Sequence, residues 1–213
     1  MADAGGLDAA VPDAQIDAAL VDAGTDAPAV DAGLVRLSII SAAATCGPDT
    51  AVFPAPGEEG MYYAVRLTPP AYPFVVTAIE YEIDANPGAG VNCLASLAHS
   101  VQVFTATTVA PPTTPTVLEE IDVPADPSIV SDRAVHADLT TPITLDTGED
   151  LFVSLKMTGL TPDILCVKTC VDPDPDFDRN YWSNATMAPF SWARLHTFGL
   201  DDDARIEALG RPL

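Results

Sequence analysis

From Leu34 to the C-terminus, hydrophobic and polar residues alternate in short runs, and this period of two predicts half-buried β-strands. The clearest run is Phe74–Ile83, whose second half places Ile79, Tyr81 and Ile83 on one face and glutamates on the other. No segment has the period of a convincing amphipathic helix. The same alternation predicts strands at Val35–Ile39, Met61–Leu67, Ser100–Thr105, Val117–Val123, Arg133–Leu139, Leu151–Met157, Ile164–Val167, Tyr181–Asn184, Trp192–Phe198 and Arg205–Leu209.

Turn-forming residues separate these strands. Pro69-Pro70, Asn86-Pro87-Gly88 and Thr147-Gly148 all fall between strand candidates, and the chain contains 20 prolines, which a helical protein would not tolerate. Short strands at nearly regular spacing predict a two-sheet antiparallel β-sandwich of the jelly-roll or immunoglobulin-like type. With no internal repeat and no second linker, residues 34–213 are predicted to form one all-β domain.

The stretch Pro142–Leu155 resembles a segment of extracellular β-sandwiches, in which a Leu-x-x-Gly turn leads into a core strand. The resemblance implies that Leu145 anchors the turn and that Gly148 supplies a positive φ. Alternation then predicts that Leu151, Val153 and Leu155 point into the core, whereas Phe152 points the other way. Because the tyrosine of the fibronectin-like version is missing, the segment supports an architecture and not that family.

Residues 1–33 differ in composition from the rest of the chain. Asp-Ala dipeptides recur from Asp3 to Asp31 at intervals of four or five residues, with no basic or aromatic residue between them. Repelling carboxylates and few large apolar groups predict a disordered tether, with a short Ala-rich helix between Ile16 and Ala23 as the alternative. This stretch resembles the Asp/Ala-rich tethers that follow the lipid-attached cysteine of myxobacterial secreted or surface lipoproteins. The attachment cysteine itself is absent here, so a membrane contact through a lipid anchor would need a residue that this sequence lacks.

The formal net charge of −22, from nine basic and 31 acidic residues, limits the partners. Such a field repels nucleic acid and anionic membrane surfaces. Divalent cations, basic proteins and neutral sugars stay compatible with it, so the predicted partner is an unknown protein or polysaccharide. Solubility in a salty exterior is the simpler explanation of the charge.

Four cysteines, Cys46, Cys93, Cys166 and Cys170, suit two disulfides in an oxidising compartment. Three pairings exist, and we favour Cys166–Cys170 together with Cys46–Cys93. A zinc site is the alternative, but there is no C-x-x-C pair and the histidines stand in no ligand spacing. We therefore predict an extracytoplasmic protein, secreted or on the outer cell surface. The N-terminus lacks the features of a signal peptide, and no apolar run is long enough to cross a membrane.

The loop at residues 172–178 is the sharpest candidate for a metal site. Asp172, Asp174, Asp176 and Asp178 alternate with other residues, and calcium binds six to eight such oxygens. The spacing is similar to the opening of an EF-hand loop, but Phe177 stands where that loop needs glycine. A solvated acidic loop is the alternative. A second acidic run, residues 201–203, would add ligands only if folding brings it near Asp176.

Aromatic residues gather late in the chain, and they suggest a carbohydrate site. Tyr181, Trp182 and Trp192 are candidates for a sugar-stacking platform, and alternation predicts that at most one of Tyr181 and Trp182 joins the core. Packing in the interior is the competing interpretation.

No catalytic motif is present: there is no G-x-S-x-G, no H-E-x-x-H and no glycine-rich phosphate loop. His99 and His136 are expected to make ordinary hydrogen bonds on strand faces. The sequence thus predicts a non-catalytic exported module with a binding or structural role and no required cofactor. The alternatives are a carbohydrate-binding module, assisted or not by calcium, and an undetected hydrolase.

Overall fold

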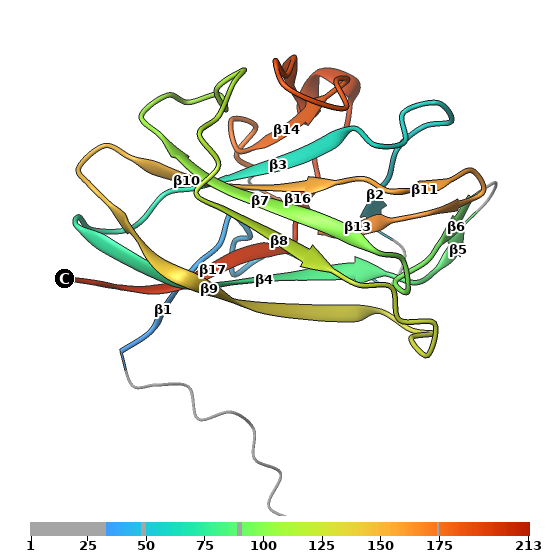
Figure 1. The fold of residues 1–213 in the computed structure, drawn as a ribbon, viewed down its shortest axis with the longest axis horizontal. Helices are drawn as coiled ribbons and strands as arrows, with labels where there is room; N and C mark the ends of the chain where they lie inside the picture. Colours follow the sequence, from blue (N-terminus) through green and yellow to red (C-terminus); the bar gives the residue numbers. More distant parts are fainter. Residues whose placement is uncertain (1–32, 48–49, 89–90, 174) are drawn as a thin grey trace, which may run out of the picture. The chain divides into compact units, whose positions relative to one another are not determined.

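The structure, a computed structural model, describes residues 33–47, 50–88, 91–173 and 175–213. Ala32–Leu213 form one compact unit (Figure 1). Apart from Gly33, the predicted tether and the alternative helix within it lie outside the described residues.

Two large sheets account for most strands, and every ladder within them is antiparallel. The first is built around the long strand β4 (Phe74–Asp84), which pairs with β9 (Arg133–Leu145) along one edge and β17 (Ile206–Pro212) along the other. Its remaining strands in the described residues are β1 (Val35–Leu37), β2 (Ala51–Val52), β13 (Cys166–Cys170) and β16 (Asp203–Ala204).

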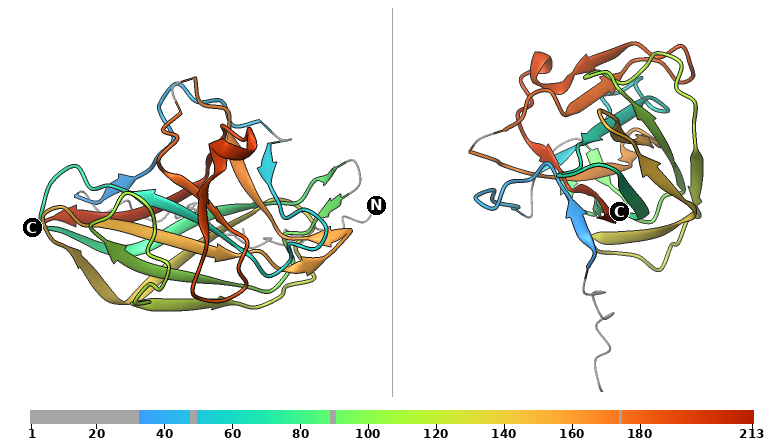
Figure 2. Two further views of the ribbon diagram at one scale, coloured as in Figure 1. Left: turned by 90° about the horizontal axis from the view of Figure 1, so that it is seen from above. Right: turned by 90° about the vertical axis from the view of Figure 1, so that its left-hand side faces the viewer.

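The second large sheet has the order β15 (Trp192–Arg194), β14 (Asn180–Ser183), β3 (Tyr62–Leu67), β10 (Asp150–Lys156), β7 (His99–Ala106) and β8 (Glu119–Val123). A small third sheet joins β11 (Gly159–Leu160), β12 (Asp163–Ile164), β6 (Val91–Cys93) and β5 (Pro87–Gly88), with β12 parallel to β6. The end-on view in Figure 2 shows the two large sheets facing one another. The predicted all-β, two-sheet sandwich is confirmed.

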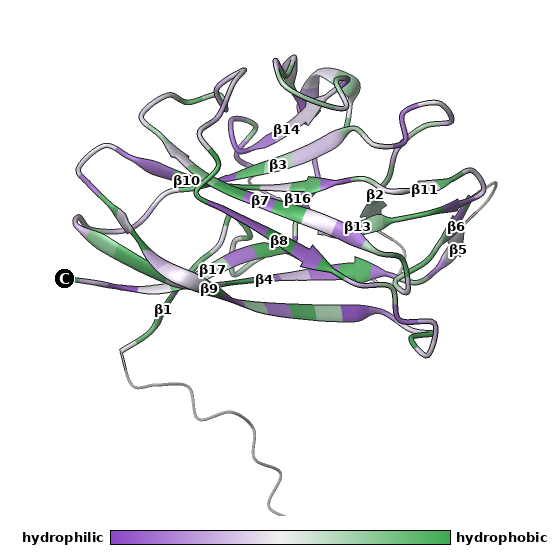
Figure 3. Cartoon of the chain, viewed as in Figure 1, coloured by the Kyte–Doolittle hydropathy of each residue, from purple (hydrophilic) through white to green (hydrophobic). Residues whose placement is uncertain are grey.

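The core lies between the two large sheets, and alternation decides which side chains enter it. In β4, Ile79, Tyr81 and Ile83 are buried while the glutamates between them are only partly covered, as predicted. Alternating apolar and polar bands along the strands are visible in Figure 3. Val153 and Leu155 of β10 face the same core. Burying side chains of this size contributes about 1.5–3 kcal/mol each.

The opposite face of the six-stranded sheet is also covered, which alternation alone could not show. Phe152 points away from the main core, as predicted, and packs on Phe104 with ring centroids 5.4 Å apart. The Tyr181 hydroxyl donates to the Val109 carbonyl at 2.8 Å, and Trp192 Nε1 donates to the Pro112 carbonyl at 3.0 Å. The segment between β7 and β8 therefore folds over this face.

A β-bulge in the first sheet explains why β9 extends beyond its predicted end at Leu139. The pairing of β4 with β9 shifts register between Val76 and Ala78, and β17 shifts opposite the same place. Pro142 fits within β9 because it lies in the shifted stretch of a strand that pairs only with β4, so no ladder partner needs its missing N–H. Gly210 lies at the matching bulge of β17, where a Cβ would come within 2.2 Å of the Val75 carbonyl oxygen.

The turn between β9 and β10 forms as its resemblance implied. Gly148 has a φ of 87°, and the Glu149 N–H donates to the Asp146 carbonyl at 2.9 Å. Leu145 and Leu151, on either side of the turn, are fully buried.

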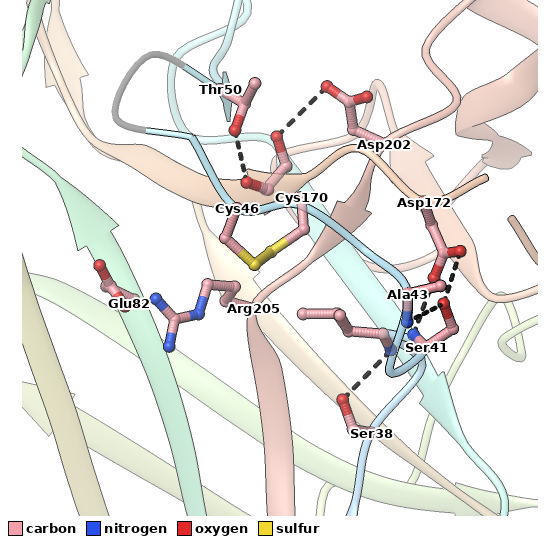
Figure 4. The surroundings of a disulfide bond; sticks show 12 residues. Ser38, Ser41, Ala43, Cys46, Thr50, Glu82, Cys170, Asp172, Asp202 and Arg205 are labelled. Atoms are coloured by element: carbon pink, nitrogen blue, oxygen red, sulfur yellow. Dashed lines mark hydrogen bonds and ion pairs between the residues drawn. A yellow bond between two sulfur atoms is a disulfide. The ribbon is translucent and has the colours of Figure 1, made fainter.

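The predicted disulfide pairing is wrong, although both disulfides form. Cys46 pairs with Cys170 (Figure 4), and Cys93 pairs with Cys166. Cys166 and Cys170 lie at the two ends of β13, where four residues of extended chain span about 13 Å. A disulfide needs Cα atoms within about 7 Å, so these two cysteines cannot reach each other. Both disulfides therefore tie β13 to distant segments.

Lys168 lies between the two disulfides on β13, on the same side of the strand. Its Nζ donates to Asp84 at 3.1 Å and to Asp132 at 2.7 Å, and the side chains of Lys168 and Asp84 are 5% and 3% exposed. Burial acts to lower the pKa of Lys168, but the bonds to Asp132 and Asp84 outweigh it and hold the pKa above its usual value. The lysine is therefore charged, and its loss would leave a buried carboxylate without this cation.

Three predicted strands have other bounds in the structure. Val35–Ile39 ends at Leu37, and Ile164–Val167 is divided between β12 and β13. Trp192–Phe198 was expected to be extended, but β15 stops at Arg194 and a 3-10 helix, η1 (Leu195–Phe198), follows. The Gly199 N–H donates to the His196 carbonyl at 2.9 Å with φ at 75°, which closes the helical turn. Leu195 is buried and fixes η1 to the core.

Peptide mapping without reductant should recover Cys46 joined to Cys170 and Cys93 joined to Cys166. The two closures span 124 and 73 residues, so reduction should lower the free energy of unfolding by about 3–5 kcal/mol per bond. A melting temperature unchanged by reductant would contradict this.

Lys168→Met should destabilise the fold by about 3–5 kcal/mol, because it leaves Asp84 buried without its cation. Asp132→Asn is the matched control. The Asp132 side chain is 41% exposed, so its loss should cost less than about 1 kcal/mol. Urea unfolding of the three proteins measures both values, and equal losses would contradict the assignment.

Candidate functional site

An apolar hollow of about 210 Å³ opens beside η1 and is the candidate binding site. Its exposed walls are Phe53, Phe198 and Leu200, which are 43%, 53% and 45% exposed. Clusters of exposed apolar side chains commonly mark binding surfaces. Three buried residues, Val52, Trp182 and Leu195, complete the lining together with the exposed Ala55 and the Glu58 carboxylate.

The first wall comes from the loop that joins β2 to β3. The Glu58 N–H donates to the Ala55 carbonyl at 2.9 Å, while the Glu58 carboxylate accepts from the Ala55 N–H at 3.0 Å. This reciprocal pair closes a turn just after Phe53. It fixes a carboxylate at the edge of an otherwise apolar surface.

The second wall comes from η1 and the residues after it. Because Leu195 enters the core and Gly199 ends the turn, the chain presents Phe198 and Leu200 outward. His196, on the same turn, stacks on Phe177 with ring centroids 4.0 Å apart and bonds to Asp201. The apolar surface of η1 thus meets the aspartate loop at residues 172–178.

The predicted sugar platform does not form as expected. Tyr181 and Trp182 do point to opposite faces, but both are buried, at 1% and 5% exposure, because β14 is covered on both sides. The expectation that one of them stays half-exposed is therefore wrong. Trp182 is part of the lining of the hollow, and Trp192 packs against the cluster on the other face.

The carboxylates of the proposed calcium loop bond to separate protein partners. Asp172 accepts from the Ser41 N–H at 2.7 Å and the Ser41 hydroxyl at 2.8 Å. Asp176 pairs with Arg179, and Asp178 pairs with Arg194 at 2.7 Å. Asp174 lies outside the described residues. In the part of the chain that the structure describes, no three acidic, histidine or cysteine side chains form a metal-binding group. Calcium binding stays an untested prediction.

The second acidic run does approach the first. Asp203 is 1% exposed, and its Oδ1 accepts from Asn180 Nδ2 at 2.7 Å; Asn180 in turn accepts from the buried Tyr63 hydroxyl. Among the described residues, Asp203 Oδ2 has no hydrogen-bond partner. Burial raises the pKa of Asp203 to about 6, the bond from Asn180 opposes this, and the nearby charges of Asp172 and Asp176 raise it further.

A larger hollow, of about 470 Å³, lies on the outer face of the first sheet, and its charged side chains are paired with each other. Arg36 bridges Glu80 and Glu207, and Arg205 pairs with Glu82. Such a ladder of cross-strand pairs stabilises a solvated sheet face. We therefore place the candidate site at the apolar hollow.

The histidines make the ordinary hydrogen bonds that the sequence predicted. His99 bonds through its two ring nitrogens to the Tyr81 hydroxyl at 2.7 Å and the Leu97 carbonyl at 3.0 Å, and burial lowers its pKa. His136 lies between Glu80 and Asp138, and the bond to Glu80 is the main cause that raises its pKa.

The two disulfides indicate a protein that matures in an oxidising, extracytoplasmic environment. Among the described residues, no helix combines the length and apolarity that a membrane span requires.

No protein-family model matches the chain, and no curated protein matches its sequence. Among solved structures, it is similar to the clostridial cysteine protease Cwp84 after propeptide cleavage, with a TM-score of 0.58, 10% identity, and 86% of this chain and 41% of that chain covered. It is also similar to a structure of the cysteine protease and lectin-like domains of Cwp84, a surface layer associated protein of Clostridium difficile, with a TM-score of 0.50, 11% identity, and 72% and 32% covered. The chain thus spans less than half of either structure, and the likeness concerns the fold.

Sequence reasoning missed the residues that wall the hollow. Phe198 was assigned to a strand, and Phe53 and Leu200 belonged to no predicted element. The local signal was Gly199, which lies between Phe198 and Leu200. A glycine in this position favours a turn, and a turn can expose the apolar side chains next to it. Their common position depends on loops more than 140 residues apart.

Asp203→Asn should raise the melting temperature at pH 7.5. The folded pKa of about 6 lies above the unfolded value of about 3.9, so the folded state binds more protons and loses stability as pH rises from about 4 to 6. Asparagine keeps the acceptor for Asn180 and removes the buried charge. The difference in melting temperature between variant and wild type should grow across this window and level off above it, and a difference independent of pH would contradict the assignment.

Proposed function

We propose that this protein is a non-catalytic, exported β-sandwich module that binds a partner at the apolar hollow. The proposal rests mainly on the exposure of Phe53, Phe198 and Leu200 around a recess that Trp182 also lines. Keeping three large apolar side chains in water is unfavourable, and a partner that covers them recovers that free energy.

Export to the cell surface or the medium is part of the proposal. The disulfides support it, and one structural neighbour carries the description of a surface layer associated protein. Residues 1–33 are proposed to serve as a tether, because a flexible chain of that length spans roughly 30 Å and like charges extend it further. Such a tether would hold the domain clear of the surface that bears it.

A binding role is favoured over catalysis by the state of the cysteines. The neighbours include a cysteine protease, an activity that needs a thiolate nucleophile. All four cysteines of this chain are held in disulfides, so none of them supplies a thiolate. His99 is buried, and its two ring nitrogens bond to the Tyr81 hydroxyl and the Leu97 carbonyl.

Carbohydrate binding is the second candidate, because the description of one neighbour includes lectin-like domains. A recess of 210 Å³ is smaller than the roughly 300–1,000 Å³ that enclose a drug-sized ligand, so it accommodates one ring or one side chain. Either a sugar ring or an apolar side chain meets that limit. Sugar recognition, however, needs several polar groups around the ring, and Glu58 is the one charged residue of the described lining.

Saturation-transfer NMR with benzyl alcohol and methyl β-glucopyranoside tests the proposal. Benzyl alcohol should receive saturation from the protein, and Phe198→Ser should weaken its binding at least about fivefold, the effect of losing roughly 1 kcal/mol of contact. Val130→Ser removes an apolar side chain that is 88% exposed outside the lining, and it should leave binding unchanged. Binding of the glucoside alone would favour the carbohydrate function, and binding of neither probe would contradict the hollow as a site.

A further inference from the structure

We propose that the occupant of the hollow is a cationic polypeptide segment, in which lysine or arginine flanks an aromatic or large aliphatic side chain. This inference rests on the proposed function and names the chemistry of its partner. It follows from the distribution of charge around the apolar walls.

Acidic residues border the hollow from three segments. Glu58 is part of the lining, and Asp201 and Asp202 directly follow Leu200. The third segment is residues 176–178, which lie next to η1 because the Phe177 ring contacts the His196 ring, with centroids 4.0 Å apart. The fold therefore brings both acidic runs of the sequence to the same end of the domain.

The two local arginines do not neutralise this end. Arg179 pairs with Asp176, and Arg194 pairs with Asp178. Beyond these pairs, Asp203 is buried close enough to Asp172 and Asp176 to feel their charges. The chain as a whole carries a net charge of −22, so its overall charge does not offset the local excess.

The small apolar recess and the acidic residues around it together indicate which partner would bind. The recess takes one ring or side chain, and the walls need apolar contact. The surrounding carboxylates attract positive charges on both sides of that side chain and repel an acidic partner. Because Asp201 is exposed and Glu58 and Asp202 are partly exposed, their attraction should accelerate association and weaken as salt is added.

Three acetylated peptide amides of sequence Lys-Phe-Lys, Gln-Phe-Gln and Glu-Phe-Glu test the inference. The readout is Trp182 emission in a Trp192→Phe background, because the chain has two tryptophans and Trp182 lines the recess. At low ionic strength, the lysine peptide should bind at least tenfold more tightly than the glutamate peptide. Sodium chloride at about 0.5 M should reduce that ratio to less than threefold.

Glu58→Gln should weaken the lysine peptide two- to threefold and leave the glutamine peptide unchanged, because glutamine keeps the acceptor for the Ala55 N–H. Asp138→Asn is the control; it removes the same charge from a side chain that is 85% exposed on β9, outside the lining. It should leave all three affinities unchanged.

The outcomes separate this inference from the proposed function. Equal binding of the three peptides, lost in Phe198→Ser, would overturn the cationic partner and keep the hollow as a binding site. No binding of any peptide, together with binding of methyl β-glucopyranoside at the hollow, would overturn the peptide partner in favour of a sugar. Failure of all probes, benzyl alcohol included, would overturn both proposals.

Discussion

The attachment of β13 is the constraint on which the rest of the structure depends. One side of this strand faces the core through Val167, and the other carries Cys166, Lys168 and Cys170 in alternation. Two disulfides and a buried ion pair thereby fix five residues to distant parts of the chain. Its ladders with β2, β4 and β16 contain only two residue pairs each, so the strand would otherwise be held weakly.

A series of direct contacts connects β13 to the candidate site. Beyond Cys170 the chain enters the aspartate loop, where Ser41 binds Asp172 (Figure 4). β16 pairs with β13, and Asp203 of β16 holds Asn180 at the start of β14. β14 then supplies Trp182 to the lining of the hollow. The segments next to the exposed apolar residues are therefore restrained by covalent bonds and by buried polar contacts.

The same arrangement gathers negative charge where the domain is most restrained. An acidic chain gains solubility from self-repulsion, but at this end the repulsion reaches a buried carboxyl group, Asp203. Burial is the main cause that raises the pKa of Asp203 to about 6, and the charges of Asp172 and Asp176 raise it further. The charge that favours a basic partner therefore carries a cost in stability. A bound cationic segment would reduce both the exposed apolar surface and part of that repulsion.

The sequence by itself determined the sandwich, because a period of two in hydrophobicity shows which side chains of a strand are buried. Ile79, Tyr81 and Ile83 are buried as predicted. Gly148 has the positive φ that was expected for the turn. It also determined that the cysteines oxidise, since an even number in such a chain favours disulfides. Only the tertiary structure decided the cysteine partners, the burial of both Tyr181 and Trp182, and the meeting of Phe53 with Phe198. Alternation tells which way a side chain points, whereas what lies opposite it depends on segments far away in the chain.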